Sequence, residues 1–346
     1  MNAMQRVVTT LQHQEPDRVP VFLLMTMHGA KELGLSIRDY FHSAEAVAEG
    51  QLRLRAKYGH DCYYTFFYAP IEVEGWGAEM IWRDDGPPVS GGPLLDDFDA
   101  IERLQVPDLD APGFQRVLET TRLLKAEAGD DVPIVGVVMS PFSLPVMQVG
   151  FEGYLLLLME QPALWQRLMA INEALCIAWA NAQLEAGATA ICYFDPVSSS
   201  TIIPPDLYRR TGNVVARRVL PAIHGPTATH MASGRSSSII DDLAATGTAA
   251  LAATVEENLA DLKRRTVGRL TLLGNLNGIE MRRWSSAETE NCVRAAIAQG
   301  GPGGGFILSD CHGEIPWQVP DATLHAIMAA ARRWGQYPLT GSQHDN

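Results

Sequence analysis

The side chains best suited to chemistry lie where two short apolar segments end. The stretch 308–314, LSDCHGE, follows an apolar run and carries a thiol, an imidazole and two carboxyl groups. About eighty residues earlier, the strand-like segment 227–230, TATH, ends in a histidine. Imidazole and thiolate are ligands that zinc prefers. His230 and Cys311 could therefore share a metal ion or form an acid/base site, provided that both segments end at the same edge of a sheet.

Short β-rich runs alternate with longer helical patterns, which is typical of parallel strands joined by helices. Eight strands are expected, over residues 19–25, 61–66, 133–138, 188–194, 226–230, 248–253, 270–275 and 305–309. Between the second and third strands, residues 71–83 alternate about two glycines, which indicates an inserted β-hairpin. We predict an α/β fold, a (β/α)8 TIM barrel with a β-hairpin after strand 2, forming a single domain over residues 1–346.

Polar groups follow nearly every predicted strand, and in a TIM barrel these positions form the functional face. Each candidate also has a purely structural explanation. His230 could be a buried histidine bonded to a backbone carbonyl, and Cys311 could be a small buried hydrophobe. Asp195, which precedes a proline, could simply begin a turn.

Composition limits the partners and the compartment. A formal net charge of −13 disfavours nucleic acids and acidic membranes as partners. No run approaches the ~18 apolar residues of a membrane span, and the first residues do not resemble a signal peptide, so we expect a cytoplasmic protein. The five cysteines contain no CxxC pair, which favours free thiols over a disulfide framework. The sequence leaves a homo-oligomer open.

Several segments together resemble a known family. They are residues 14–21 (QEPDRVPV), 132–136 (VPIVG), 140–143 (SPFS), 185–188 (EAGA), 195–199 (DPVSS), 274–275 (GN) and 306–309 (FILS). Nearly the whole chain resembles the uroporphyrinogen decarboxylase-like barrels. Within them it is similar to the corrinoid-dependent methyltransferases of the methylcobalamin:coenzyme M type.

The resemblance implies a zinc site built from a His-x-Cys pair after the fifth strand and a distant cysteine after the eighth. In that branch the metal activates a thiol such as coenzyme M, which takes a methyl group from a separate corrinoid protein. Other members are thought to pass methyl groups between corrinoid proteins and tetrahydrofolate. His230 and Cys311 match the pattern, but Ala232 stands where it has a cysteine. Either His312, Glu314 or another carboxylate is the third ligand, or metal binds weakly or not at all.

The decarboxylase branch of the family is a weaker match. Its members use arginines just after the first strand to bind the carboxylates of a tetrapyrrole. Here residues 25–30 read MTMHGA, and the next arginine after them is Arg38. A substrate with many carboxylates would lack its cationic partners, which disfavours porphyrinogen decarboxylation.

The resulting prediction is a methyltransferase that moves a methyl group between cobalamin on a corrinoid partner protein and a small acceptor or donor, such as a thiol or tetrahydrofolate. Zinc assistance is left open. The predicted site residues are Asp195, Glu314 and His312 for catalysis, His28, Tyr64, Ser140 and Asn275 for substrate binding, and His230 and Cys311 for metal. Two alternatives remain: a metal-independent decarboxylase or lyase of a smaller carboxylated substrate, and a non-catalytic binding subunit that has lost its site.

Overall fold

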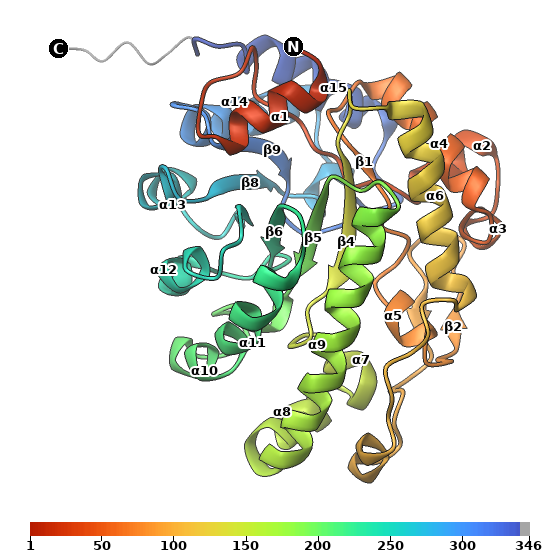
Figure 1. The fold of residues 1–346 in the computed structure, drawn as a ribbon. Coiled ribbons are helices and arrows are strands. Elements are labelled where there is room, and N and C mark those ends of the chain that lie inside the picture. Colours follow the sequence, from red (N-terminus) through yellow and green to blue (C-terminus); the bar gives the residue numbers. More distant parts are fainter. Residues whose placement is uncertain (340–346) are drawn as a thin grey trace.

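The computed structural model describes residues 1–339 and shows strands curled around a common centre with helices outside them (Figure 1). The main sheet has seven strands in the order β1-β4-β5-β6-β7-β8-β9. All of its neighbouring strands pair in parallel. The strands are β1 (Tyr63–Tyr64), β4 (Ile134–Met139), β5 (Ala190–Phe194), β6 (Thr227–His230), β7 (Ala250–Ala252), β8 (Thr271–Leu276) and β9 (Phe306–Asp310). This curled parallel sheet confirms the predicted TIM-barrel class.

The first predicted strand, residues 19–25, does not form a regular strand, yet it closes the ring between β9 and β1. The Leu308 N–H donates to the Pro20 carbonyl at 2.9 Å, and the Phe22 N–H donates to the Leu308 carbonyl at 2.9 Å. On the other side, the Asp61 N–H donates to the Val21 carbonyl at 2.8 Å. Regular pairing is interrupted because Pro20 has no N–H and because the Val21 N–H donates to the Asp61 carboxylate instead, at 2.8 Å.

The Asp61 carboxylate joins this closing segment to the rest of the ring. It is buried and accepts hydrogen bonds from Arg6 at 2.8 Å and from Arg18 at 2.7 and 2.8 Å. Arg6 also binds Asp17 through two hydrogen bonds of 2.7 Å. A buried carboxylate with two guanidinium partners is fully paired, so removing any one charge would leave another without compensation.

The helices surround the ring in chain order. They are α1 (Ala3–Leu11), α2 (His28–Leu33), α3 (Ile37–Phe41), α4 (Ala44–Tyr58), α5 (Ile71–Glu74), α6 (Pro112–Ala128), α7 (Pro145–Val149), α8 (Phe151–Glu160), α9 (Pro162–Glu185), α10 (Pro205–Arg210), α11 (Gly212–Val219), α12 (Ile240–Ala244), α13 (Leu259–Thr266), α14 (Ser286–Gly300) and α15 (Asp321–Trp334). Short 3-10 helices are η1 (Phe98–Glu102), η2 (Pro196–Ser198), η3 (Leu220–Ala222), η4 (Ser237–Ile239) and η5 (Glu280–Arg282). None of the helices within residues 1–339 is both long and apolar enough to span a bilayer.

The inserted hairpin exists, but it begins later than predicted. Its antiparallel strands are β2 (Met80–Ile81) and β3 (Val89–Ser90). The start of the predicted segment is helix α5, in which Ile71, Glu72 and Val73 are all buried. A strand would place neighbouring side chains on opposite faces, so three consecutive buried residues favour the helical turn. Glu72 also accepts the Met139 N–H at 2.9 Å, which fixes this turn against β4.

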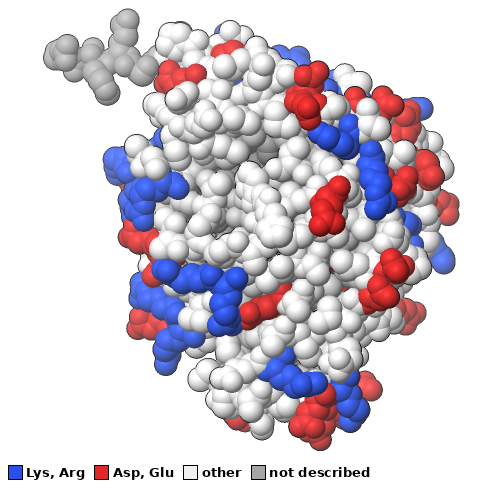
Figure 2. Space-filling model, viewed as in Figure 1, with Lys and Arg blue, Asp and Glu red and all other residues white. Residues whose placement is uncertain are grey.

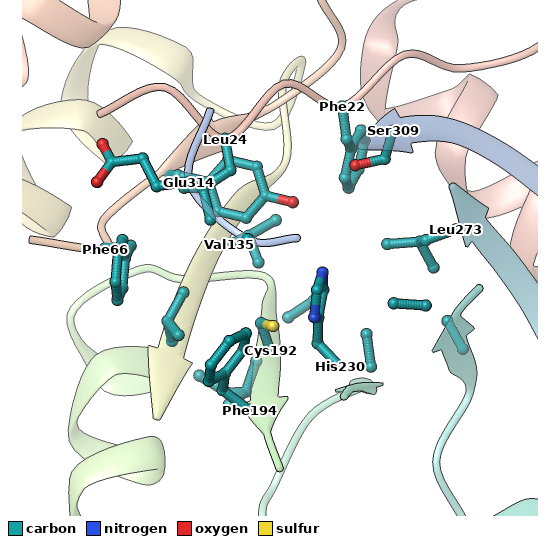
Figure 3. Close-up of a pocket in the computed structure, with 18 of the residues that line it drawn as sticks. Phe22, Leu24, Phe66, Val135, Cys192, Phe194, His230, Leu273, Ser309 and Glu314 are labelled. Atoms are coloured by element: carbon teal, nitrogen blue, oxygen red, sulfur yellow. The ribbon is translucent and has the colours of Figure 1, made fainter. Parts of the chain in front are cut away.

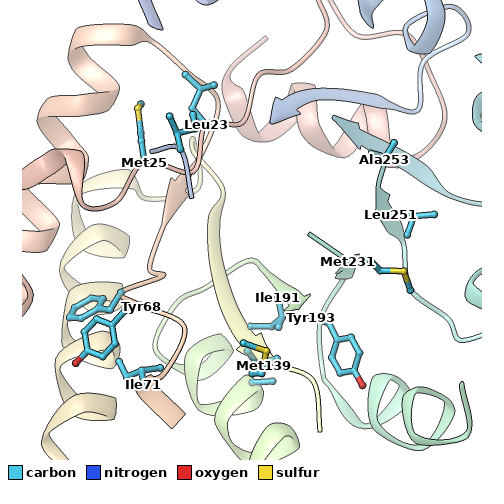
Figure 4. Close-up of a cluster of buried hydrophobic side chains, with 14 of the residues drawn as sticks. Leu23, Met25, Tyr68, Ile71, Met139, Ile191, Tyr193, Met231, Leu251 and Ala253 are labelled. Atoms are coloured by element: carbon cyan, nitrogen blue, oxygen red, sulfur yellow. The ribbon is translucent and has the colours of Figure 1, made fainter. Parts of the chain in front are cut away.

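Alternation along the strands separates two apolar layers. On β5, Ile191 and Tyr193 belong to the large cluster of buried side chains (Figure 4). This cluster also contains the α9 residue Trp179. Cys192, between Ile191 and Tyr193, belongs to the inner cluster and lines the interior of the ring. A strand with both faces buried accounts for the continuous apolar run in the sequence.

Candidate active site

The interior of the ring contains a cavity of about 510 Å³. Most TIM barrels fill this space with layers of branched side chains. Here β6 and β7 contribute small residues to the lining, namely Ala228, Ala250 and Ala252. The space that these alanines leave open is bounded by larger apolar side chains, which are Val7, Leu11, Phe22, Leu24, Phe66, Val135, Val137, Cys192, Phe194, Leu273 and Ile307.

The polar lining is concentrated at the carboxyl ends of β6 and β9. His230 ends β6, while Ser309 and Asp310 end β9, and His312 and Glu314 follow in the next loop. Strands that run in parallel deliver their ends to the same side of the ring, which explains how these distant segments meet. In Figure 3 the labelled His230, Ser309 and Glu314 surround the cavity together with apolar side chains.

His230 presents a neutral N–H group. Its Nδ1 accepts the Ala232 N–H at 3.0 Å, and Ala232 adopts a φ of 50° in the turn that brings this N–H into position. Burial, with a smaller contribution from His312, lowers the pKa of His230 to about 4. A neutral imidazole whose Nδ1 accepts a hydrogen bond must carry its proton on Nε2. Figure 3 shows the ring projecting between Cys192 and Leu273.

Two buried carboxyl groups flank the same end of the cavity. Asp310 Oδ2 accepts the N–H groups of His312 and Gly313 at 2.9 and 3.1 Å. Burial raises the pKa of Asp310 to about 7, despite these hydrogen bonds. Asp310 therefore titrates near neutral pH and can give or take a proton there.

Glu314 is more strongly perturbed. Its Oε1 accepts the Met27 N–H at 2.6 Å, whereas its Oε2 is buried without a hydrogen-bond partner. Burial raises the pKa of Glu314 to about 8, and the negative charge of Asp310 adds to the shift. Figure 3 shows its carboxyl group pointing away from His230, toward the side where Phe66 lies. Glu314 is thus placed to hold the loop near Met27 more directly than to touch a ligand beside His230.

The donor set does not fit zinc as the side chains lie. His230 Nδ1 is occupied by the Ala232 N–H, and a protonated Nε2 has no lone pair for a metal. Cys311 is buried, does not line the cavity, and has its pKa raised to about 11 by burial. Its thiol lies 3.4 Å from Nδ1 of His312. Within residues 1–339, no three His, Cys, Asp or Glu side chains group closely enough to hold a metal ion.

Two of the predicted site residues, Asp195 and Ser140, lie together but outside the cavity lining. Asp195 Oδ1 accepts the hydroxyls of Ser140 and Ser143 at 2.5 and 2.7 Å. Burial raises the pKa of Asp195 even though these hydroxyls oppose the shift. The Ser140–Asp195 bond ties the end of β4 to the end of β5, and the Asp195 N–H donates to the carbonyl of His230, at the end of β6, at 2.7 Å.

His28 and Asn275 also lie outside the cavity lining. His28 Nε2 bonds the carbonyls of Ile315 and Pro316 at 3.3 and 3.1 Å, and burial lowers its pKa to about 4. Asn275 donates to the Thr254 carbonyl at 3.3 Å. Of the nine predicted site residues, the cavity lining therefore includes Tyr64, His230, His312 and Glu314. The roles predicted for all nine stay predictions.

Within the described part of the chain, the cavity lining carries no cationic side chain. Within residues 1–339, neither lysine nor arginine is among the residues that border it. Figure 2 shows the charged side chains mainly toward the edge of the visible face, with uncharged residues around the hollow near its centre. A ligand with several negative charges would find no counter-charge inside.

Sequence reasoning did not select Asp310, although it stands in the segment that drew attention first. Asp310 could have been found from its position as the last residue of an apolar strand, the same feature that pointed to His230. The apolar walls were also missed as a binding surface. Their signal was the alternation that places Phe22 and Leu24 on the inner side of the first segment and Leu23 and Met25 in the outer cluster.

Comparisons with known proteins place this geometry in a family. The sequence profile of the family described as "Uroporphyrinogen decarboxylase (URO-D)" matches residues 2–334. The methylcobamide:CoM methyltransferase MtaA of Methanosarcina barkeri is 25% identical, with 79% of this chain and 81% of that protein aligned. The uroporphyrinogen decarboxylase of Alkalilimnicola ehrlichii is 26% identical over 97% of both chains.

A solved structure supports the same fold. A methyltransferase from Methanosarcina mazei superposes with a TM-score of 0.87 at 22% identity, covering 96% of this chain and 99% of that one. Identity at this level establishes a shared architecture. The sequence relatives include both methyltransferases and decarboxylases, so family membership alone does not identify the reaction.

Proposed function

The chain belongs to the uroporphyrinogen decarboxylase family, and within it we propose that the protein is a methyltransferase. It would move a methyl group between a corrinoid held by a partner protein and a small acceptor or donor, such as a thiol or tetrahydrofolate. The observation that carries the proposal is the apolar cavity at the centre of the ring, which has no lysine or arginine in its lining within residues 1–339.

This lining argues against porphyrinogen decarboxylation. A tetrapyrrole substrate brings many carboxylates, and each buried charge without a partner costs several kcal/mol. Methyl transfer makes no such demand, because the moving group is apolar and uncharged. Apolar walls also exclude water, which would otherwise compete for an activated methyl group.

The polar end of the cavity supplies two functions to such a reaction. The His230 Nε2–H can hold the heteroatom that gains or loses the methyl group, and it stays neutral across the physiological pH range because the pKa of His230 is lowered to about 4. Asp310, with a pKa raised to about 7, can exchange a proton with that heteroatom. The corrinoid, when brought by its partner, would supply or receive the methyl group at its cobalt.

A second candidate is a metal-independent decarboxylase or lyase acting on a smaller carboxylated substrate. Asp310 favours it, because a carboxylic acid that is partly protonated near pH 7 can donate a proton to a carbanion. The absence of a lysine or arginine from the lining within residues 1–339 weighs against it, as it also does against an anionic acceptor such as tetrahydrofolate.

The test is a methyl-transfer assay with methylcobalamin as donor, followed by the loss of its visible absorbance. The acceptors are 2-mercaptoethanol, 2-mercaptoethanesulfonate and tetrahydrofolate, each with and without a corrinoid protein. We expect turnover with at least one acceptor, and we expect His230→Phe to reduce it at least tenfold while the surface variant Glu280→Gln does not. The reverse direction is tested with cob(I)alamin and the methylated products. No transfer above the uncatalysed rate in either direction would refute the proposal.

A further inference from the structure

The ring cavity differs from a site built for a charged ligand in three respects, and the first is the nature of its walls. From α1 to the far end of the strands, its sides are formed by aliphatic and aromatic side chains such as Leu11, Phe22, Val135 and Leu273. Burying a ligand's apolar surface against such walls is favourable by about 25 cal/mol per Å². The volume of about 510 Å³ is within the range of pockets that enclose whole organic molecules.

The second respect is charge. An anionic ligand would meet no lysine or arginine in the lining, within residues 1–339. At the polar end a cationic ligand would meet the carboxyl groups of Asp310 and Glu314. One oxygen of each accepts backbone N–H groups, and the Glu314 carboxyl points away from His230. An anion therefore finds no opposite charge in the lining within residues 1–339, and pairing of a cation with these carboxyl groups is an outcome of the displacement test.

The third respect is the hydrogen-bond donor at the polar end. Since Ala232 donates to Nδ1 of His230, the ring offers Nε2–H to the cavity. Within residues 1–339 no protein group accepts this N–H, so it is available to an acceptor atom of a ligand. An uncharged oxygen or nitrogen with a lone pair meets this need without the desolvation cost of an ion.

We propose that this cavity binds an uncharged, mainly apolar molecule that presents one acceptor atom to His230 Nε2–H. The inference rests on the proposed function in one respect: such a molecule is the methyl donor or acceptor of that reaction. It narrows the small-molecule donor or acceptor to neutral compounds, and among the acceptors named above it excludes the anionic 2-mercaptoethanesulfonate and tetrahydrofolate. Binding can be measured without turnover, so the two proposals can fail separately.

Two fluorescent probes with one skeleton test the charge requirement. N-phenyl-1-naphthylamine is neutral, and 1-anilinonaphthalene-8-sulfonate is the same molecule with one sulfonate. We expect the neutral probe to bind at least tenfold more tightly, with a stoichiometry of one. Equal binding of both, tighter binding of the anion, or no binding of the neutral probe would overturn the proposal. The effect of a positive charge is tested by displacement of the neutral probe. Phenyltrimethylammonium should compete at least tenfold more weakly than tert-butylbenzene. The reverse order would also overturn the proposal.

Variants locate the probe inside the ring. Ala252→Phe fills the cavity from β7 and should weaken binding of the neutral probe at least tenfold, whereas Ala287→Phe, on the exposed side of α14, should not. Ala228→Leu fills the same space from β6 and should also weaken binding of the neutral probe. It replaces Ala252→Phe in the test if that variant does not fold. Unchanged binding in a folded cavity variant would overturn the proposal.

A last comparison tests the acceptor atom. Acetophenone and isopropylbenzene have nearly the same shape, but only the first has a carbonyl oxygen. The ratio of their displacement constants should shift at least fivefold toward isopropylbenzene in His230→Phe, as expected for one lost hydrogen bond worth about 1 kcal/mol. An unchanged ratio would remove His230 from the binding site.

Discussion

The buried carboxyl group of Glu314 should make the stability of the protein depend on pH. Burial raises the pKa of Glu314 from 4.5 to about 8. In the unfolded chain this group ionises near its ordinary pKa, while in the folded protein it stays protonated. As the pH rises from about 4.5 to about 8, ionisation therefore favours the unfolded state, and above pH 8 the loss is complete.

The size of the effect follows from the shift. One pKa unit corresponds to about 1.4 kcal/mol, so Glu314 accounts for a decrease of up to about 5 kcal/mol in the free energy of unfolding across this window. Glu314→Gln keeps the shape of the side chain and its acceptor for the Met27 N–H, but cannot ionise. The variant should thus gain stability relative to the wild type as the pH rises, and should differ least from it below pH 4.5.

The measurement is urea unfolding of both proteins at several pH values between 4.5 and 8.5, with the difference in unfolding free energy plotted against pH. Asp310 is present in both proteins, so its own titration largely cancels in the difference. Glu280→Gln, which replaces an exposed carboxyl, is measured in parallel as the control substitution. A flat difference for Glu314→Gln would show that this carboxyl is ionised in the folded protein, and the description of the site would be wrong.

Three further predictions follow from the contacts around the ring. Asp61→Asn should lower the free energy of unfolding by about 3–5 kcal/mol, because it leaves the guanidinium groups of Arg6 and Arg18 without their buried partner; a loss below about 1 kcal/mol in urea unfolding would contradict this. Asp195→Ala should cost about 2–4 kcal/mol by the same measurement, since two buried serine hydroxyls lose their acceptor, and an unchanged stability would contradict it. After dialysis against zinc-free buffer, the protein should retain far less than one zinc ion per chain by elemental analysis, with Cys311→Ser no different; one tightly held zinc lost on that substitution would contradict the assigned geometry.

The strand pattern was readable from the sequence because each inner strand is apolar and short. β4, β5, β8 and β9 all lie within two residues of their predicted bounds. The irregularity of the first segment could not be predicted from its own residues. It arises because Asp61, forty positions later, accepts the Val21 N–H and interrupts regular pairing. The hairpin was displaced because Glu72 is held by β4, a contact that alternation within residues 71–83 does not reveal.

The location of the candidate site could be predicted from the sequence, but the residues that line it were harder to predict. Strand ends correctly directed attention to His230 and to the loop after β9, since parallel strands end on one side. The direction in which each side chain points could not be predicted, because consecutive residues after a strand can face either the cavity or the surrounding shell. Asp310 borders the cavity while its neighbour Cys311 does not, and Asp195 turns toward two serines. The sequence alone also could not show that Nδ1 of His230 accepts a hydrogen bond from the Ala232 N–H.

The closing segment has a consequence for how the chain is made. Val21 bridges to Leu308, so all residues between these two positions must be synthesised before the two edges can join. Until then the growing sheet stays open, with an unpaired edge and the apolar walls of the later cavity facing solvent. Arg18 and Asp61 are both synthesised before β9, and the ion pair between them can hold the first segment beside β1 until β9 is made.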